Sequence, residues 1–196
     1  MAIHGTALPM DEIARSAGLS SGTLYRNFAS RQDLLRALYD VLAHELEVLV
    51  ARVVLAPRGW DSIVAYIDGV VAIAHAHPEL APVMAHMRDV DSGYRSGGEH
   101  WVAAAEEIAA RAQAEGSVRA DITAADLVYI PHLLVPIVRW PQPQRGVLLA
   151  RMRALLLDSL RPAAQHAPLP LGPLSAAAVR AGAFSPGVPA QSASHG

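Results

Sequence analysis

Apolar side chains recur at the spacing of an α-helix over a long stretch near the start of the chain. The stretch begins at Ser30, which Asp33 follows three positions later, and this pair is typical of a capping box at a helix start. The pattern ends before Pro57 and its apolar positions are Leu34, Leu38, Val41, Leu42, Leu49 and Val53. Residues 30–54 are therefore predicted to form one helix about 37 Å long, enough to join two domains rigidly.

Shorter helical patterns lie on both sides of this long helix. Two of them flank Gly18 within residues 9–28, and five follow at residues 61–75, 78–88, 99–115, 123–140 and 145–160. Pro78 falls at a helix start, Gly116 is placed as a C-cap, and Pro141 marks a turn. Alternating strand patterns are nearly absent and no hairpin turn signal occurs between them, so the sequence predicts an all-α fold.

The character of the chain changes after position 161. Residues 162–196 hold six prolines, four glycines and one charged side chain, which is typical of a disordered segment rather than a packed helix. We therefore expect three parts: an N-terminal domain with its connecting helix at residues 1–54, a second domain at 55–161, and a tail at 162–196.

Composition excludes several classes of protein. The net charge is −2 and there is no cysteine, which excludes disulfide scaffolds, thiol nucleophiles and cysteine-type metal sites. All 16 basic residues are arginine, so Schiff-base chemistry and the P-loop lysine are excluded as well. No signal peptide or membrane-spanning run is present, and we expect a cytoplasmic protein without a membrane partner.

The block from Met10 to Phe28 has the pattern of two helices joined by a tight turn. Ile13, Ala14 and Ala17 are predicted to form the inner face of the first helix, and Gly18 can take the positive φ that the turn needs. Either Ser20 or Ser21 is expected to cap the second helix, and Leu24 and Phe28 lie four positions apart, so both should point inward.

The outward face of that second helix carries hydroxyl, phenol, amide and guanidinium groups and no acid. Between Leu19 and Arg31 the charge is +2, from Arg26 and Arg31. Such groups suit phosphates and base edges, so the block predicts a DNA-binding helix-turn-helix.

The same block resembles the DNA-binding segment of the tetracycline-repressor (TetR) family. The matching pieces are Asp11-Glu12-Ile13-Ala14, Ala17-Gly18-Leu19-Ser20, Gly22-Thr23-Leu24-Tyr25, Asn27-Phe28, and Arg31 with Leu34-Leu35. The resemblance implies a homodimeric, cytoplasmic repressor that binds a palindromic double-stranded DNA operator and is released by a small-molecule effector. It implies base or backbone contacts from Ser21, Thr23 and Arg26 and phosphate contacts from Tyr25, Asn27 and Arg31, with Ser20 and Gly22 on the same surface.

One part of the family pattern differs. Members of the family begin with a further helix of roughly 15 residues, whereas only residues 1–8 precede the first short helix here. Ile3-His4-Gly5 resembles the end of that helix, so the first helix is interpreted as missing. Either the start codon lies inside the true gene, which we favour, or the DNA-binding head is weakened. The second possibility keeps open a helical ligand-binding or interaction dimer that no longer binds DNA.

The second domain carries aromatic and methionine side chains that could line a pocket for a mostly apolar effector. The candidates are Tyr66, Met84, Met87, Trp101 and His132, and the alternative is that they fill an ordinary core. Histidines at positions 75, 77, 86 and 100 invite a metal site, but an i, i+2 pair points to different sides of a helix. We therefore expect no metal and no cofactor, and histidines that favour helix C-termini instead.

Two further interpretations concern assembly and catalysis. Residues 123–140 and 145–160 are rich in apolar positions, with Leu148, Met152, Leu155, Leu156 and Ser159 along one face, which favours a four-helix dimer interface over an internal core.

Residues 18–22 match the G-x-S-x-G pattern of hydrolases formally, but that motif needs a preceding strand in a large α/β sheet. We therefore predict no enzyme and no catalytic residue.

Overall fold

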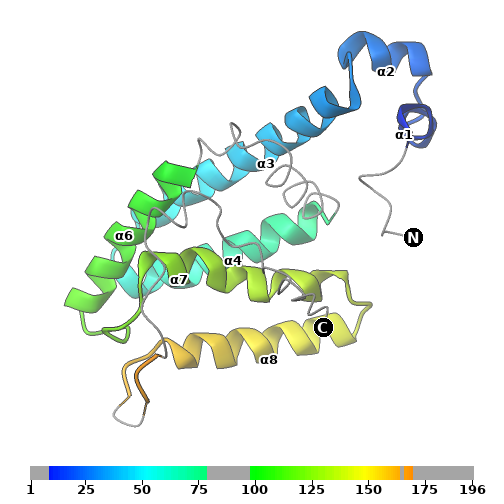
Figure 1. Cartoon of the computed structure of the whole chain (residues 1–196). Coiled ribbons are helices and arrows are strands. Elements are labelled where there is room, and N and C mark those ends of the chain that lie inside the picture. Colours follow the sequence, from blue (N-terminus) through cyan, green and yellow to red (C-terminus); the bar gives the residue numbers. More distant parts are fainter. Residues whose placement is uncertain (1–8, 79–97, 164–165, 170–196) are drawn as a thin grey trace, which may run out of the picture.

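The computed structural model describes residues 9–78, 98–163 and 166–169, and every regular element in these ranges is helical (Figure 1). In chain order the elements are α1 (Met10–Ser16), α2 (Ser21–Asn27), α3 (Arg31–Val54), α4 (Gly59–Ala76), α6 (Gly98–Ala114), α7 (Ala124–Tyr129), the 3₁₀ helices η2 (Ile130–Leu133) and η3 (Val135–Arg139), and α8 (Gln144–Ser159). The all-α prediction is confirmed, and four of the predicted helices agree with α3, α4, α6 and α8 to within two residues at each end. The helix predicted at 78–88 falls almost wholly outside the described residues.

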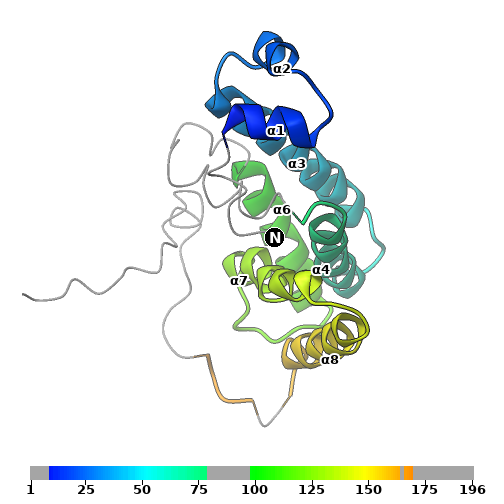
Figure 2. The ribbon, with the colours of Figure 1, turned by 90° about the vertical axis from the view of Figure 1, so that its right-hand side faces the viewer.

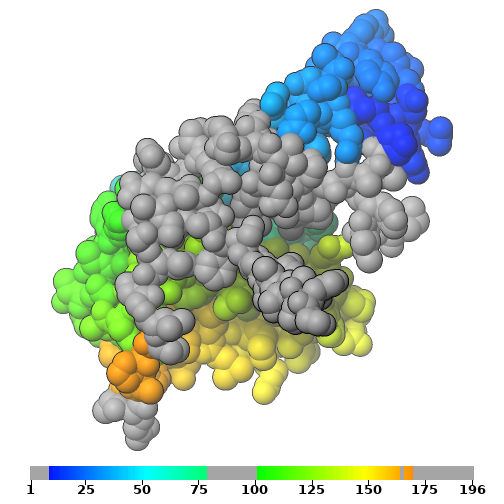
Figure 3. Space-filling model, in the orientation of Figure 1, coloured from blue at the N-terminus to red at the C-terminus, as the bar shows by residue number. Residues whose placement is uncertain are grey.

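The helices form an elongated molecule with a small head at one end. In Figures 1 and 2, α1 and α2 lie at one end, α8 lies at the opposite end, and α3 runs from the head into the helical body. The space-filling view shows the head standing at one extremity of the molecule (Figure 3). A displacement of α3 within the body would therefore move the head.

The start of α3 is set by a local signal. The side chain of Ser30 accepts a hydrogen bond from the Asp33 backbone N–H at 3.1 Å and donates one to Asp33 Oδ2 at 2.7 Å. The first of these bonds satisfies a backbone donor that the first turn of a helix leaves free, and the second holds the Ser30 hydroxyl in place. The predicted cap is confirmed.

The main core is centred on α4, which contacts α3, α6, η2 and η3. Ile63 and Ile67 of α4 are each 1% exposed, and Leu134, between η2 and η3, and Leu160, after α8, are each 2% exposed. Burial of each such side chain is worth about 1.5–3 kcal/mol, so α4 is the element on which the second domain depends most for stability.

The single helix predicted over residues 123–140 is wrong. Only Ala124–Tyr129 is α-helical, and two 3₁₀ helices come after it, with Pro131 and Pro136 in their first turns. A proline lacks the N–H that an α-helix needs and its ring crowds the preceding turn. The spacing of the apolar positions is helical as predicted, but the two prolines end the α-helix early and the later turns are wound more tightly.

A short part of the predicted tail is held against the second domain. Arg119 donates from Nη2 to the Ala167 carbonyl at 2.8 Å, and the Leu169 N–H donates to Asp121 Oδ2 at 3.0 Å. The rest of the tail beyond residue 169 is outside the described residues. No helix in the described ranges is long and apolar enough to cross a membrane.

Candidate nucleic-acid interface and effector cavity

The head is built around a small apolar core. Met10, Ala14 and Leu24 are 6%, 0% and 5% exposed, and Ile13, Phe28 and Leu34 pack against them. Because Ala14 has only a methyl group, α2 can cross α1 closely. The inward roles predicted for Ile13, Ala14, Leu24 and Phe28 are confirmed.

The turn between α1 and α2 follows the sequence signal. Gly18 has φ of 70°, a left-handed conformation that favours glycine, and the next N–H, of Leu19, donates to the Ala14 carbonyl at 2.8 Å. The inward role predicted for Ala17 is wrong. Its backbone is the C-cap of α1, and its side chain is exposed because the helix has ended one residue before it.

Ser20, rather than Ser21, caps α2. The Thr23 backbone N–H donates to Ser20 Oγ at 3.1 Å, and the hydroxyls of Ser20 and Thr23 lie 2.8 Å apart. Ser20 therefore has a structural task that is independent of any DNA contact.

Ser20→Ala should lower the free energy of unfolding of the head by about 1 kcal/mol, because the cap bond to Thr23 is lost. Ser21→Ala is the matched control, since it removes a hydroxyl one position along and should change stability by less than about 0.5 kcal/mol. Urea unfolding followed by circular dichroism measures both. Equal losses in the two variants would contradict the assignment of the cap.

The face of α2 away from the core is polar and free of acids. Ser20, Gly22, Tyr25, Arg26 and Asn27 are exposed, and Ser21 and Thr23 are half-buried. The long side chains of this face fold back along their own helix. Arg26 donates from Nε to the Gly22 carbonyl at 3.2 Å, and Asn27 donates from Nδ2 to the Thr23 carbonyl at 2.9 Å. These bonds hold the two side chains close to the helix. On binding DNA, Arg26 and Asn27 would have to give up these bonds and contact phosphates or bases instead.

Arg31 differs from the other predicted DNA contacts. It is half-buried at the start of α3, and its Nε and Nη2 are buried with no hydrogen-bond partner in the part of the chain that the structure describes. Buried guanidinium donors are costly when unpaired, so an anion placed beside them would be stabilising.

A small cavity lies where the connecting helix α3 meets three helices of the second domain. It has a volume of about 20 Å³ and is lined by Val50 of α3, by Ile63, Tyr66 and Ile67 of α4, by Trp101, Ala104, Ala105 and Ile108 of α6, and by Leu127 of α7. The structure thus brings together two of the five predicted effector residues, Tyr66 and Trp101. Met84 and Met87 lie outside the described residues.

His132 is not brought to this cavity. Its side chain is exposed on η2, with its ring centroid 6.4 Å from that of Tyr129. A 3₁₀ helix turns by about 120° per residue rather than 100°, so the side chains after Tyr129 point in other directions than they would in one continuous α-helix.

Two of the residues that line the cavity, Tyr66 and Trp101, carry a polar group, and the other lining residues are aliphatic. Burial raises the pKa of Tyr66 to about 12, so its hydroxyl stays protonated well above neutral pH. The indole Nε1 of Trp101 is buried and has no hydrogen-bond partner among the described residues. A neutral donor without a partner is unusual in a protein interior and marks this cavity as a candidate binding site.

The raised pKa of Tyr66 predicts a loss of stability at high pH. The unfolded chain loses this proton near pH 10 whereas the folded chain keeps it until about pH 12, so stability falls as pH rises between these values. Two pKa units correspond to about 2–3 kcal/mol. Urea unfolding of the parent protein and of Tyr66→Phe across this range measures it. The difference between the two proteins should change with pH by this amount, and a constant difference would contradict the prediction.

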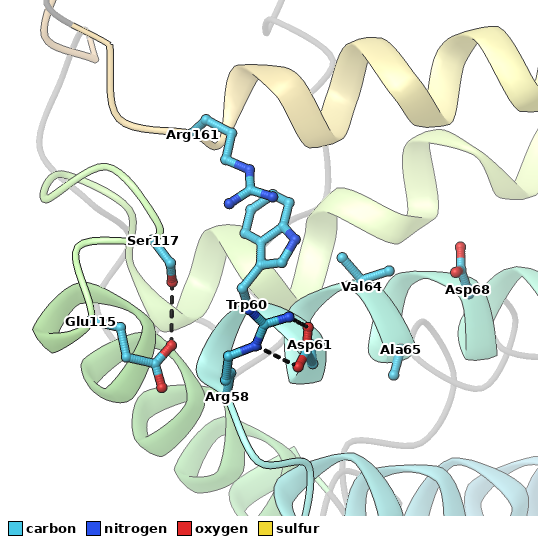
Figure 4. Close-up of a pocket in the computed structure, with 9 residues that line it drawn as sticks. All are labelled: Arg58, Trp60, Asp61, Val64, Ala65, Asp68, Glu115, Ser117 and Arg161. Atoms are coloured by element: carbon cyan, nitrogen blue, oxygen red, sulfur yellow. Dashed lines mark hydrogen bonds and ion pairs between the residues drawn. The ribbon is translucent and has the colours of Figure 1, made fainter.

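Sequence reasoning missed a larger, open groove at the end of the domain far from the head. Its volume is about 670 Å³, and its lining residues, drawn in Figure 4, are Arg58, Trp60, Asp61, Val64, Ala65, Asp68, Glu115, Ser117 and Arg161. The Arg161 guanidinium lies 3.4 Å from the centre of the Trp60 ring. Trp60 and Arg161 are about one hundred residues apart in the sequence, so no local sequence pattern predicts the groove.

The carboxylates of the groove are already paired. Arg58 binds Asp61 through two hydrogen bonds of 2.9 Å, and Arg153 binds Asp68 in the same two-pronged way. Glu115 accepts from the Gly59 N–H at 2.9 and 3.0 Å. Pairing with the aspartates raises the pKa of Arg58 and of Arg153, and Arg58 lowers the pKa of Asp61. The groove is better explained as a set of exposed pairs that join α4 to α6 and α8 than as an effector site.

The apolar face predicted for dimerisation is only partly covered by the chain itself. Leu155 is 59% exposed, whereas Leu148, Met152 and Leu156 are half-buried against the core. Leu133 of η2, Trp140 after η3 and Val147 of α8 are also exposed. Whether this face forms a dimer interface stays a prediction.

The predicted alternative of a metal site receives no support from the described residues. No three histidine, aspartate or glutamate side chains in these ranges lie close enough to hold a metal ion. His77 follows α4 as its C-cap, and its Nε2 lies 2.9 Å from Glu45 Oε1 of α3. His86 is outside the described residues, and the side chain of His100 is not described.

Two family models match the chain in succession. The model of bacterial regulatory proteins of the tetR family matches residues 3–38, and that of the SbtR-like transcriptional regulator C-terminal domain matches residues 56–162. The second match spans more than half of the chain. Comparison with curated proteins finds no match.

Solved structures support the same relationship. The TetR transcriptional regulator SCO0520 from Streptomyces coelicolor is 28% identical, with a TM-score of 0.54 over 79% of this chain and 87% of that chain. The TetR family transcriptional regulator PfmR from Thermus thermophilus is 15% identical, with a TM-score of 0.63 over 81% of this chain and 92% of that chain. At 15% identity the second likeness concerns the fold alone.

Proposed function

The chain belongs to the TetR family of bacterial regulatory proteins, and from this premise we propose that it is a ligand-responsive repressor that binds a palindromic operator as a homodimer. Members of the family are DNA-binding regulators and not enzymes. Ser20, the serine of the G-x-S-x-G match, caps α2 after a helix and not after a strand. We propose that the protein acts in the cytoplasm, and that residues 1–54, 55–161 and 162–196 form its head, its ligand-binding and dimerisation domain and its tail.

The observation that carries the proposal is the face of α2. A helix of seven residues presents exposed Tyr25, Arg26 and Asn27 without any acid, while Leu24 anchors it to the head. A helix of this kind can enter the major groove and contact base edges and phosphates. In a homodimer two such helices would read half-sites about 34–36 Å apart, or at a related spacing.

The ligand response is supported by the position of the cavity. Val50 lines it and belongs to α3, whose other end begins at the head. A ligand that moves α3 would change the separation of the two heads. Such coupling is usually about 1–3 kcal/mol, and operator must then weaken ligand binding by the same factor. Equal ligand affinity with and without operator would exclude this mechanism.

Selection from a random duplex library by the purified 196-residue chain, followed by a salt titration of the selected duplex, tests the proposal. We expect a palindrome whose affinity falls steeply with salt, because phosphate contacts release counterions. Absence of any selected sequence would favour the alternative of a helical ligand-binding dimer that does not bind DNA.

Arg26→Ala should weaken binding to the selected operator by about tenfold, because one arginine contact to a base or phosphate is typically worth about 1–3 kcal/mol. Arg52→Ala is the matched control, since Arg52 is exposed on α3 and its replacement removes the same charge. Fluorescence anisotropy measures both affinities, and circular dichroism checks that helicity is unchanged. An affinity for Arg26→Ala equal to that of the control would remove Arg26 from the interface.

A further inference from the structure

The cavity beside Tyr66 and Trp101 is so small that a ligand larger than water could enter only if the surrounding helices moved. A volume of about 20 Å³ corresponds to roughly one water molecule. Any organic ligand must therefore part the walls. Those walls belong to α3, α4, α6 and α7, and the α3 wall is Val50.

The residue before Val50 packs closely against α4. Leu49 is 3% exposed, and its side chain lies so close to Gly69 of α4 that a Cβ at that glycine would be 2.7 Å from Leu49 Cδ2. Close-packed interiors have low compressibility and transmit strain from one element to the next. A ligand that displaces Val50 therefore displaces α3 together with the head.

The polar groups of the cavity restrict the chemistry of its ligand. The Trp101 Nε1 can only donate a hydrogen bond, and it is buried without a partner among the described residues. The Tyr66 hydroxyl can donate as well. The remaining described lining is aliphatic, and it includes no charged side chain that could pair with an ionic ligand.

We propose that this cavity binds a compact, uncharged, mostly apolar molecule with one hydrogen-bond acceptor, such as a ketone, and that the acceptor pairs with Trp101 Nε1. The regulatory part of this inference rests on the proposed function: on binding, the ligand parts α3 from α4 and α6 at Val50 and moves the head. The binding part concerns the isolated protein and does not require DNA.

A matched pair of probes tests the binding part. Acetophenone carries a carbonyl where α-methylstyrene, of nearly the same shape, carries a methylidene group. Calorimetric titration of the full chain should show acetophenone binding at least about tenfold more tightly, since one hydrogen bond to the buried donor distinguishes the two. In ¹H–¹⁵N spectra the indole signal of Trp101 should shift with acetophenone. Equal affinities, no binding of either probe, or an unmoved Trp101 signal would overturn the proposal.

Variants separate the acceptor contact from general packing. Trp101→Phe keeps a ring but removes the N–H, and it should bind the two probes equally. Trp140→Phe is the matched control because Trp140 is 51% exposed and does not line the cavity, so it should keep the preference. The indole shift in the parent protein decides the question even if Trp101→Phe does not fold.

Release of the selected operator tests the regulatory part separately. Acetophenone should weaken operator binding by the parent protein and not by Trp101→Phe. Probe discrimination without any operator binding would retain the site and refute the repressor function. Operator binding that no probe affects, with discrimination intact, would refute only the movement of α3.

Discussion

Gly59→Ala is expected to lower the free energy of unfolding of the second domain by about 3 kcal/mol or more, the upper part of the range for overpacked cores. A Cβ at Gly59 would lie 2.6 Å from the Cα of Ala112 and 2.8 Å from its Cβ. Ala112 is fully buried in α6, and the obstructing atoms belong to its backbone region rather than to a flexible side-chain end. The start of α4 would have to move away from α6.

That movement would also break a tie between the two helices. The Gly59 N–H donates to both carboxylate oxygens of Glu115, which follows the end of α6. A hydrogen bond to a charged group is worth about 1.5–3 kcal/mol, so its loss would add to the steric cost.

Urea unfolding followed by far-UV circular dichroism measures the effect, and Gly22→Ala provides the matched control. A Cβ at Gly22, in α2, would meet nothing closer than Ser20 Oγ at 3.9 Å. The control should be stabilised by about 0.4–1 kcal/mol because alanine restricts the unfolded chain. If both variants had the same stability, the close approach of α4 to α6 would be wrong.

The parts of the fold that could be predicted are those set by neighbouring residues. Gly18 and Gly116 both have positive φ, as their positions at helix ends predicted. Ser20 and Ser30 cap the helices that they precede. A cap or a turn depends on side-chain and backbone chemistry within about five residues, so the sequence alone contains the information.

The parts that failed depend on how helices wind and pack. Pro131 and Pro136 convert the second half of a predicted α-helix into 3₁₀ turns, and this change of winding takes His132 out of the predicted pocket. The contact between Gly59 and Ala112 joins positions more than fifty residues apart, which one-dimensional spacing cannot reveal. Tyr66 and Trp101 also lie far apart in the sequence, and only the packing of α4 against α6 brings both to the cavity. Both were predicted as pocket residues from their chemical type alone.

The polar face of α2 could be predicted more easily than the cavity because it lies within one short helix. That face follows from the positions of Leu24 and Phe28 alone. The cavity depends on how four helices pack against one another. That the Trp101 N–H has no hydrogen-bond partner among the described residues can be seen only from the three-dimensional structure.

Ile67→Ala is expected to destabilise the second domain by about 3–4 kcal/mol, within the usual range for removing a large aliphatic side chain from a core. Ile67 is 1% exposed and lines the cavity beside Tyr66 and Trp101. Urea unfolding measures the loss, and Val48→Ala, at a position of α3 that is 55% exposed, should change stability by less than about 0.5 kcal/mol. A loss no larger than that of Val48→Ala would contradict the position of Ile67 in the core.

The same variant also separates packing from ligand binding. Removing most of the Ile67 side chain enlarges the cavity, and an apolar cavity of sufficient size binds small organic molecules. Acetophenone should therefore restore part of the lost stability, by about 2.7 kcal/mol at a concentration one hundred times its dissociation constant.

Leu160→Ala is the control for this step, since Leu160 is 2% exposed but does not line the cavity. It should be destabilised to a similar extent, and acetophenone should restore it no more than it stabilises the parent protein. Equal restoration of the two variants would mean that acetophenone stabilises the fold without occupying the cavity next to Val50. Ligand binding in this cavity could then not be what moves α3.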